Sequence, residues 1–239
     1  MTRKPKAPPQ PASRPLWRRA LGWLARGILG VAAFYLALIL LFSFLPPPGN
    51  IYQWQESWRL GGIQRDWVNI DDIAPEMGRS VVAAEDANFC LHWGFDIKAI
   101  RDAIDSGGQR GASTLSQQVV KNVFLWQNRS WLRKALEAAL TPVMELLWSK
   151  QRILEMYLNQ AEFAEGVFGV QAAAQYHFGV DARDLTPTQA ARLAAVLPNP
   201  KDYSAGKPGS YVRNRARQII TGAETIAVDG RASCFEVQD

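Results

Sequence analysis

The feature that most constrains this chain is an uncharged apolar run of 19 residues from Gly27 to Leu45. A helix of about 20 apolar residues spans the hydrocarbon core of a bilayer, and apolar residues continue the run on the other side of Arg26. Prolines at 46–48 follow, and because proline cannot continue a helix they should end it and begin an exposed linker. We predict a transmembrane helix at residues 21–45.

Charge is distributed unevenly about this run. Residues 1–45 contain no acidic residue and seven basic ones, which are Arg3, Lys4, Lys6, Arg14, Arg18, Arg19 and Arg26. Subtracting these seven positive charges from the net charge of +5 leaves −2 for residues 46–239. The basic character thus belongs to a tail, which removes the main support for nucleic-acid binding. Basic residues flank the cytoplasmic end of a transmembrane helix, so residues 1–20 should be a cytoplasmic tail and residues 46–239 should lie outside the cytoplasm.

A cleaved signal peptide is the alternative to an anchor. The apolar run is longer than the roughly 7–15 residues typical of a signal peptide, and no small-x-small cleavage site precedes the prolines. The sequence therefore favours a permanent single-pass anchor.

Residues 46–239 have a helical pattern with little strand alternation. Capping residues and apolar spacing predict seven or eight helices. Their expected starts are Asp71 or Asp72, Asp96, Ser113, Ser130, Ser149, Phe168, Thr186 (with Gln189 as a capping box) and Ser210 or Tyr211. The predicted fold class is all-α.

The chain has two cysteines, Cys90 and Cys234. They could pair in an oxidising compartment, but spacing alone does not show that they are close. The expectation is two unpaired small apolar side chains.

Glu85 is the first candidate catalytic residue. The apolar residues 81–84 precede it, and burial beside an apolar wall disfavours the ionised form of a carboxylate, an environment that suits a general base or acid. A helix-ending salt bridge is the plain alternative, and Asp86 is interpreted as a structural partner.

Glu137 is the second candidate. Arg133 lies four residues earlier on the same helical face, so an ordinary surface ion pair is the plain interpretation. Lys121, Arg133 and Lys134 nevertheless form a cation cluster in an otherwise slightly acidic domain, which suits an anionic leaving group such as pyrophosphate. Residues 111–114 add hydroxyls and free N–H groups at a helix start, as in a phosphate-binding site.

The aromatic and apolar segment from Val123 to Trp131 has two interpretations. It is either packed in the core or a surface patch that enters the bilayer beside the anchor, with tryptophan at the interface.

Five ordered motifs in residues 60–205 resemble those of glycosyltransferase family 51, the peptidoglycan glycosyltransferases. They are Glu85-Asp86-x-x-Phe89-x-x-His92-x-Gly94, Gly111-x-Ser113-Thr114-x-x-Gln117-Gln118-x-x-Lys121-Asn122, Arg133-Lys134-x-x-Glu137, Lys150-x-x-Ile153-Leu154-Glu155-x-Tyr157-Leu158-Asn159 with Gly166-x-x-Gly169-Val170, and Leu193-Ala194-Ala195-Val196-Leu197-Pro198-x-Pro200.

The resemblance implies a lysozyme-like α fold and the polymerisation of lipid II for cell wall biosynthesis. The growing chain on undecaprenyl pyrophosphate would be the donor, and the 4-hydroxyl of the GlcNAc of lipid II would attack it with inversion. Glu85 would be the base, and Glu137 would assist the departing pyrophosphate. The substrate-binding set would be Asp86, His92, Arg110, Ser113, Thr114, Gln118, Lys121, Asn122, Arg133 and Lys134, in which Asp86 and His92 support Glu85.

The same resemblance implies no organic cofactor, and a divalent cation, Mg or Mn, is a candidate at the pyrophosphate near Glu137. The implied partners are lipid II, the growing glycan chain and the membrane, with cell wall synthesis or division proteins as further candidates. The implied location is the inner membrane, with the catalytic domain periplasmic.

Three other functions compete with this interpretation. A lytic transglycosylase or lysozyme-like hydrolase would use the carboxylates but not the cation cluster. A bifunctional synthase is not expected, because the only Ser-x-x-Lys match, Ser204 to Lys207, lies in a Pro/Gly loop with no room behind it for a transpeptidase domain. A non-enzymatic membrane scaffold is disfavoured by the presence of both Glu85 and Glu137.

Overall fold

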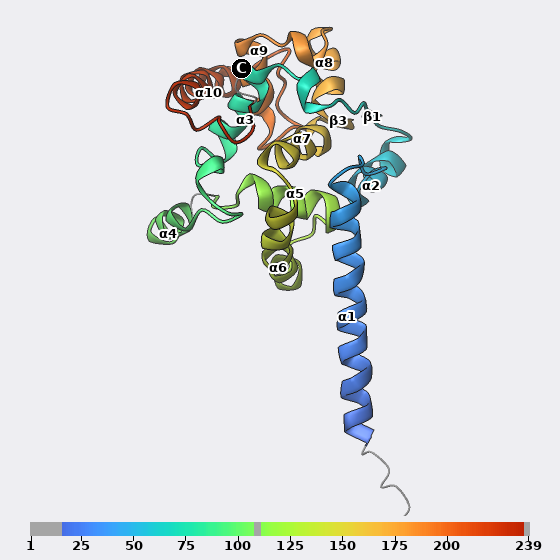
Figure 1. Ribbon diagram of the computed structural model, residues 1–239. Helices are drawn as coiled ribbons and strands as arrows, with labels where there is room; N and C mark the ends of the chain where they lie inside the picture. Colours follow the sequence, from blue (N-terminus) through green and yellow to red (C-terminus); the bar gives the residue numbers. More distant parts are fainter. Residues whose placement is uncertain (1–15, 108–110, 237–239) are drawn as a thin grey trace, which may run out of the picture. The chain divides into compact units, whose positions relative to one another are not determined.

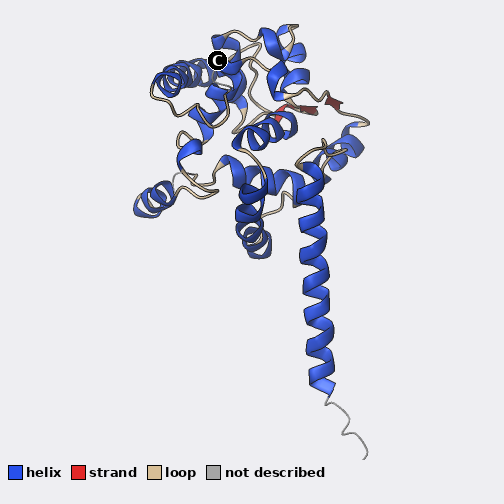
Figure 2. Cartoon of the chain, in the orientation of Figure 1, coloured by secondary structure: helices blue, strands red, loops and turns tan. Residues whose placement is uncertain are grey.

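A computed structural model describes residues 16–107 and 111–236 of the chain. Two compact units are distinguished, one ending at Leu38 and the other beginning at Ile39. In the described part of the second unit, nine α-helices follow the end of α1, together with three short 3₁₀ turns and three short strands (Figures 1 and 2). The predicted all-α class is confirmed.

The first unit is the apolar helix α1, which runs from Leu16 to Phe42 and continues into the second unit. It is the one helix among the described residues that is long and apolar enough to cross a membrane, and its apolar side chains are mostly exposed. The helix starts earlier than predicted and ends three residues earlier, at Phe42. Proline disfavours helical geometry in the residue before it, which accounts for an end ahead of Pro46.

The expectation of an exposed linker after the prolines is wrong. Pro47 is buried, and the carbonyls of Pro47 and Pro48 accept hydrogen bonds from the Arg65 guanidinium over 2.6 and 2.8 Å. A helix that the sequence did not predict, α2 (Ile51–Leu60), begins almost at once. Asn50 caps it by accepting from the Gln53 amide over 2.8 Å. The backbone from Pro47 to α2 is therefore held by hydrogen bonds within the second unit.

The remaining helices lie close to their expected positions, except that the helix expected from Phe168 begins at Val170, because Phe168 lies in a short strand. They are α3 (Pro75–Glu85), α4 (Ile97–Asp105), α5 (Leu115–Phe124), α6 (Trp131–Leu147), α7 (Lys150–Gln160), α8 (Val170–Phe178), α9 (Pro187–Val196) and α10 (Ser210–Val228). Helices α3, α9 and α10 pack against one another, and α5 packs against α6 and α7 (Figure 1). This arrangement places the C-terminal end of α3 beside the middle of α5.

Most predicted helix caps are confirmed, and two are corrected. Ser130, Ser149 and Thr186 cap α6, α7 and α9 as expected. The cap of α3 is Ala74 followed by Pro75, whereas Asp71 and Asp72 lie in a separate 3₁₀ turn. The cap of α5 is Thr114 and not Ser113, because Thr114 and Gln117 form a complete capping box.

Three short strands, which the sequence pattern did not indicate, form a small sheet. Strand β3 (Val167–Phe168) is central, parallel to β1 (Gln64–Arg65) and antiparallel to β2 (Glu162–Ala164). A turn at Gly166, with φ of 71°, connects β2 to β3. Strands of two or three residues are too short to produce a readable alternation.

The expectation of unpaired cysteines is also wrong. Cys90 and Cys234 form a disulfide between Cα atoms 5.6 Å apart, although 144 positions separate them in the chain. The bond joins the loop after α3 to the segment after α10. Only packing of α10 against α3 brings the two residues together, so local sequence carried no signal for it.

Candidate active site

Glu85 is the last residue of α3 and lies half-buried beside α5. Val81 and Val82, one turn earlier, are fully buried and hold this end of the helix in the core. The Gln118 amide donates a hydrogen bond to Glu85 Oε2 over 2.8 Å. Two predicted site residues are thereby brought together. Within residues 16–107 and 111–236 the second oxygen, Oε1, accepts no hydrogen bond, so it can face a substrate hydroxyl.

Tyr157, from α7, stands behind this pair. Its hydroxyl lies 3.5 Å from Gln118 Oε1, at the outer limit of a hydrogen bond. Burial, and next the negative charge of Glu85, raise the pKa of Tyr157 well above its ordinary value, so its hydroxyl keeps its proton. Tyr157 was quoted in a motif without a role, and the structure places it against the amide that orients Glu85.

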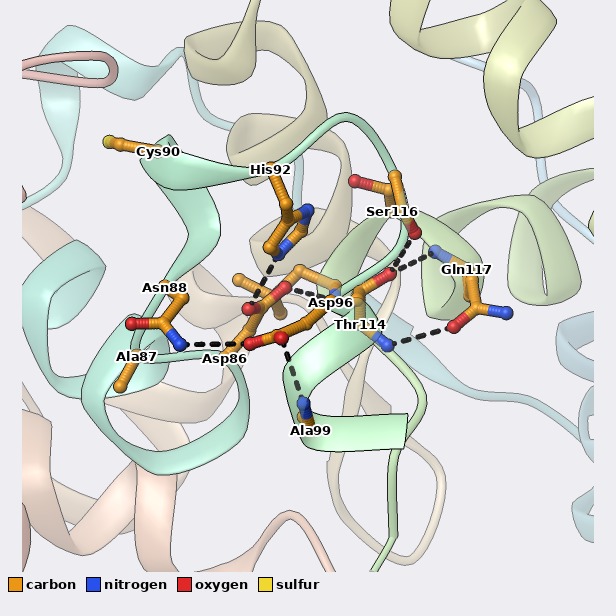
Figure 3. A network of polar contacts seen from close by, with 12 residues as sticks. Asp86, Ala87, Asn88, Cys90, His92, Asp96, Ala99, Thr114, Ser116 and Gln117 are labelled. Carbon is orange, nitrogen blue, oxygen red and sulfur yellow. Dashed lines mark hydrogen bonds and ion pairs between the residues drawn. The ribbon is translucent and has the colours of Figure 1, made fainter. Parts of the chain in front are cut away.

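Asp86 and His92 form part of a buried network that holds the loop after α3 (Figure 3). His92 Nε2 lies 2.9 Å from Asp86 Oδ1, and the Leu115 amide donates to Asp86 Oδ2 over 3.0 Å. A carboxylate at the first amide of a helix is electrostatically favourable. Both oxygens of Asp86 are engaged within the protein, which fits the expected support of Glu85 better than direct contact with substrate.

Thr114 is similarly engaged. Its hydroxyl donates to the Gly94 carbonyl over 2.7 Å and accepts from the Gln117 amide at the start of α5. Gly94 has φ of 78°, and a Cβ there would lie 2.6 Å from Thr141 Cγ2. The close approach explains the glycine in the first motif. The structure thus gives Thr114 a capping role, and its contact with substrate stays a prediction.

Glu137 on α6 is buried, with only 3% of its side chain exposed. Arg133 donates to its Oε2 over 2.7 Å, and Lys134 pairs with its Oε1. Lys134 also lies 3.3 Å from the hydroxyl of Ser113, which is exposed. An ordinary surface ion pair is therefore the wrong description of this cluster. Its carboxylate is enclosed by two cations that are themselves held in place.

Lys121 connects the two candidate carboxylates electrostatically. Burial lowers the pKa of its ammonium group, and the negative charges of Glu137 and Glu85 act in the opposite direction. The lysine therefore interacts electrostatically with both carboxylates. Because it is partly buried, this cation can attract an anionic group more strongly than a fully exposed lysine would.

Lys121 also borders a cavity of about 160 Å³ beside α5. Within the described residues this cavity is lined by two residues of the predicted site besides Lys121, namely Gln118 and Asn122. The sequence analysis missed most of its other lining residues, which include Asn50, Tyr52, Gln127, Gln160 and Glu162. Gln160 directly follows the fourth motif, and Asn50 reaches it from outside all motifs over a 2.9 Å hydrogen bond.

Lys150 is a further residue whose role the sequence did not show. Its ammonium donates to the His92 carbonyl and to Glu145, each over 2.8 Å, and lies 4.4 Å from the centre of the Phe89 ring. Ser116 of α5 donates to the same Glu145. This buried network ties the first motif to α5 and α7. Arg110, the remaining predicted site residue, lies outside the described residues.

The site does not fit a metal ion held by the protein alone. Among residues 16–107 and 111–236, no three His, Cys, Asp or Glu side chains gather closely enough to hold one. Both oxygens of Glu137 already face cations. A divalent cation carried by a substrate pyrophosphate stays a proposal.

A transglycosylase family model matches residues 54–224. The chain belongs to the transglycosylase family. The match contains every predicted site residue of this transglycosylase, from Glu85 to Glu137. It excludes α1 and the segment after residue 224, so Cys234 lies beyond it.

Several curated proteins are similar to this transglycosylase over most of their length. A biosynthetic peptidoglycan transglycosylase of Jannaschia sp. (strain CCS1) is 63% identical over 213 residues, which cover 89% of each chain. A protein with the same description from Pseudomonas entomophila (strain L48) is 54% identical over 82% of this chain and 87% of its own. One from Xanthomonas campestris pv. campestris (strain B100) is 49% identical over 89% and 91%.

Proposed function

We propose that this transglycosylase is a peptidoglycan glycosyltransferase that polymerises lipid II into glycan strands. The growing chain on undecaprenyl pyrophosphate is the donor, and the GlcNAc 4-hydroxyl of an incoming lipid II is the acceptor. Attack of this hydroxyl on the anomeric carbon of the donor MurNAc forms the new glycosidic bond. The bond to pyrophosphate breaks with inversion from α to β, so no covalent enzyme intermediate is needed.

The observation that carries this proposal is the pairing of an amide-oriented carboxylate with a cluster of cations. Glu85 presents a free oxygen on one side, and Lys121, Arg133 and Lys134 gather on α5 and α6. A transferase with a pyrophosphate leaving group needs both parts. The names and high identities of the similar proteins support the same function.

Glu85 acts as the general base in this scheme. It accepts the acceptor's hydroxyl proton as the oxygen bonds to the anomeric carbon, while Gln118 keeps the carboxylate facing the substrate. General-base catalysis of this kind contributes about 10²–10⁴-fold to a rate.

The cations act on the leaving group. Negative charge grows on the pyrophosphate as the glycosidic bond breaks, and fixed cations stabilise that charge more in the transition state than in the ground state. Glu137 holds Arg133 and Lys134 in position, since it pairs with both. It therefore orients the cations and is not itself aimed at a phosphate.

The apolar helix α1 fits a membrane anchor. We further propose that this membrane is the inner membrane, with residues 1–20 in the cytoplasm and residues 46–239 in the periplasm. Support comes from the seven basic residues and absence of acid before Leu45. A lipid-linked substrate in the same membrane meets the anchored enzyme at a high effective concentration.

One part of the Val123–Trp131 segment is packed in the core and another part lies on the surface. Phe124 and Leu125 are buried in the core, whereas Trp131 is 92% exposed and the adjoining Leu132 65% exposed. We propose that only Trp131 and Leu132, at the start of α6, form a second and weaker membrane contact. An exposed tryptophan beside a leucine suits the interfacial region of a bilayer.

The polymerase assay separates this function from its alternatives. Purified full-length protein in vesicles should convert lipid II into long glycan strands, and it should leave finished strands intact. Cleavage of finished strands without polymerisation would instead identify a lytic enzyme. Absence of turnover on both substrates would identify a non-enzymatic scaffold.

A further inference from the structure

The C-terminal helix and the segment after it contact the backbone on both sides of Glu85. The Arg215 guanidinium, on α10, donates to the Ala84 carbonyl over 3.1 Å. The Arg231 guanidinium donates to the Ala87 carbonyl over 3.0 Å. One carbonyl directly precedes Glu85 and the other follows it by two positions.

The Ala84 carbonyl needs a partner because it lies in the last turn of α3, and the Ala87 carbonyl lies in the turn that follows the helix. The last carbonyls of an α-helix have no intrahelical donor, and a cation is electrostatically favoured there. At the end of α3, the Asp86 amide serves the Val82 carbonyl over 2.9 Å. Arg215 donates a hydrogen bond to the Ala84 carbonyl. An ion pair with Asp229 restrains the guanidinium of Arg231.

A covalent bond fixes the far end of the same loop. Ala87, Asn88 and Cys90 lie on the loop that carries Asp86 and His92 (Figure 3). Cys90 is bonded to Cys234, and the buried Phe235 packs with its ring centre 6.3 Å from that of Phe89. The loop is therefore held from the side opposite to α5.

Close approach of the two helices allows these contacts. A Cβ added to Gly222 of α10 would lie 3.1 Å from the Ala83 Cβ of α3, tighter than ordinary van der Waals contact. The transglycosylase model ends at residue 224, so Arg231, Cys234 and Phe235 lie beyond the matched region.

We propose that Arg215, Arg231 and the Cys90–Cys234 disulfide form a clamp that positions the Glu85 carboxylate through the backbone of its loop. The proposal rests on the proposed function, in which Glu85 is the base. The clamp residues touch no substrate and are positioning residues. Loss of the clamp lets the end of α3 move relative to Gln118, which holds the carboxylate from the other side.

The clamp should affect kcat and leave KM unchanged. Lys121 and Arg133, which bind the donor in the proposed function, lie on α5 and α6 and make no hydrogen bond with the clamp among the described residues. A misplacement of about 1 Å at a reacting group costs up to about 10²-fold in rate. We therefore expect a fall in kcat of about 10-fold to 10²-fold.

The first experiment compares arginines of α10 and of the segment after it. Arg215→Ala and Arg231→Ala are measured in full-length protein in vesicles with lipid II, beside their melting curves. Arg213→Ala and Arg217→Ala are matched controls, because within the described part of the chain the side chains of these exposed arginines bond only to the Pro208 carbonyl and the Asn214 side chain, respectively. We expect kcat to fall in the first pair at temperatures where all four are folded, and to stay normal in the controls. Arg215→Lys, which keeps a donor for the carbonyl, should recover most of the loss.

The second experiment tests the disulfide without changing the arginines. Dithiothreitol should lower kcat of the wild type, and reoxidation should restore it. A variant with both Cys90→Ser and Cys234→Ser should start at the lower kcat and be insensitive to the reductant.

The outcomes distinguish the clamp from the proposed function. Normal kcat in the clamp variants and in reduced enzyme, with an inactive Glu85→Gln, would overturn the clamp and leave the function intact. An equal loss in Arg213→Ala would also overturn it, because the effect would then be a general one of α10. A fully active Glu85→Gln would overturn the function on which the clamp rests.

Discussion

The Gln118 side-chain amide donates to the Glu85 carboxylate over 2.8 Å, although 33 positions separate the two residues. One belongs to the end of α3 and the other to the middle of α5. The hydrogen bond leaves one carboxylate oxygen for a substrate hydroxyl, and it connects the first motif to the second. The predictions below follow from this pairing and from the cation cluster beside it.

Glu85→Gln should abolish polymerisation and leave the fold intact. The amide cannot take the proton of the acceptor hydroxyl, so the expected loss is at least about 10²–10⁴-fold. Steady-state rates and melting curves should be measured beside those of Glu76→Gln, which changes a glutamate in the first turn of the same helix. Wild-type turnover in folded Glu85→Gln would show that Glu85 is not the general base.

Arg133→Ala should damage both catalysis and stability. Its partner Glu137 is buried, and removing one member of a buried ion pair typically costs about 3–5 kcal/mol, against under about 1 kcal/mol for a surface pair. Melting curves measure the first effect. Rates measured well below the melting temperature isolate the second, for which we expect a loss of about 10²-fold or more.

Glu137→Gln tests the same ion pair by changing its anion and not its cation. It keeps the size of the side chain but leaves Arg133 and Lys134 without their shared anion, so the rate should fall strongly. If a divalent cation on the pyrophosphate also interacts with Glu137, this variant should respond less to added Mg²⁺ than the wild type does. Near-normal turnover in both Glu137→Gln and Arg133→Ala would make the cluster a scaffold.

The alkaline limit of kcat/KM should reflect Lys121. Burial lowers the pKa of this lysine below its ordinary 10.5, so its ammonium is lost at a lower pH than that of an exposed lysine. Activity should therefore fall as pH rises through this lowered pKa. Lys121→Arg keeps the positive charge and should move the fall in kcat/KM to higher pH. Lys207→Arg, which changes a lysine on an exposed loop, should leave the pH of this fall unchanged. If the pH dependence of kcat/KM is unchanged in Lys121→Arg, another group is responsible for the fall at high pH.

A reporter fused after Asp239 should lie in the periplasm. A reporter that functions only outside the cytoplasm should therefore be active there, and one that functions only in the cytoplasm should be inactive. The basic tail before α1 is expected to stay on the cytoplasmic side. Paired fusions with a periplasmic and a cytoplasmic reporter measure this directly. Activity of the cytoplasmic reporter alone would reverse the proposed orientation.

Trp131→Ala combined with Leu132→Ala should weaken membrane attachment that does not depend on α1. Flotation of residues 46–239 with liposomes measures that attachment, after circular dichroism has shown that the fragment is folded. The matched control is Tyr211→Ala, which changes a half-exposed aromatic on α10. Equal flotation of the double variant and the unchanged fragment would exclude this contact.

The sequence by itself determined the features that depend on neighbouring residues. The apolar run predicted α1, and the caps at Ser130, Ser149 and Thr186 predicted the starts of three helices. Ordered motifs predicted Glu85, Gln118 and the cation cluster as site residues. Each of these signals is carried within a few turns of helix or one motif, where residue type and spacing act directly on the backbone.

Only the tertiary structure decided the features that depend on distant segments. It paired Cys90 with Cys234, buried Glu137, and directed Arg215 to a carbonyl beside Glu85. The partners in the first and third of these contacts are 144 and 131 positions apart. Whether such groups meet depends on how α3 and α10 pack, and not on local spacing, because chain entropy favours no one distant pairing until the core has formed.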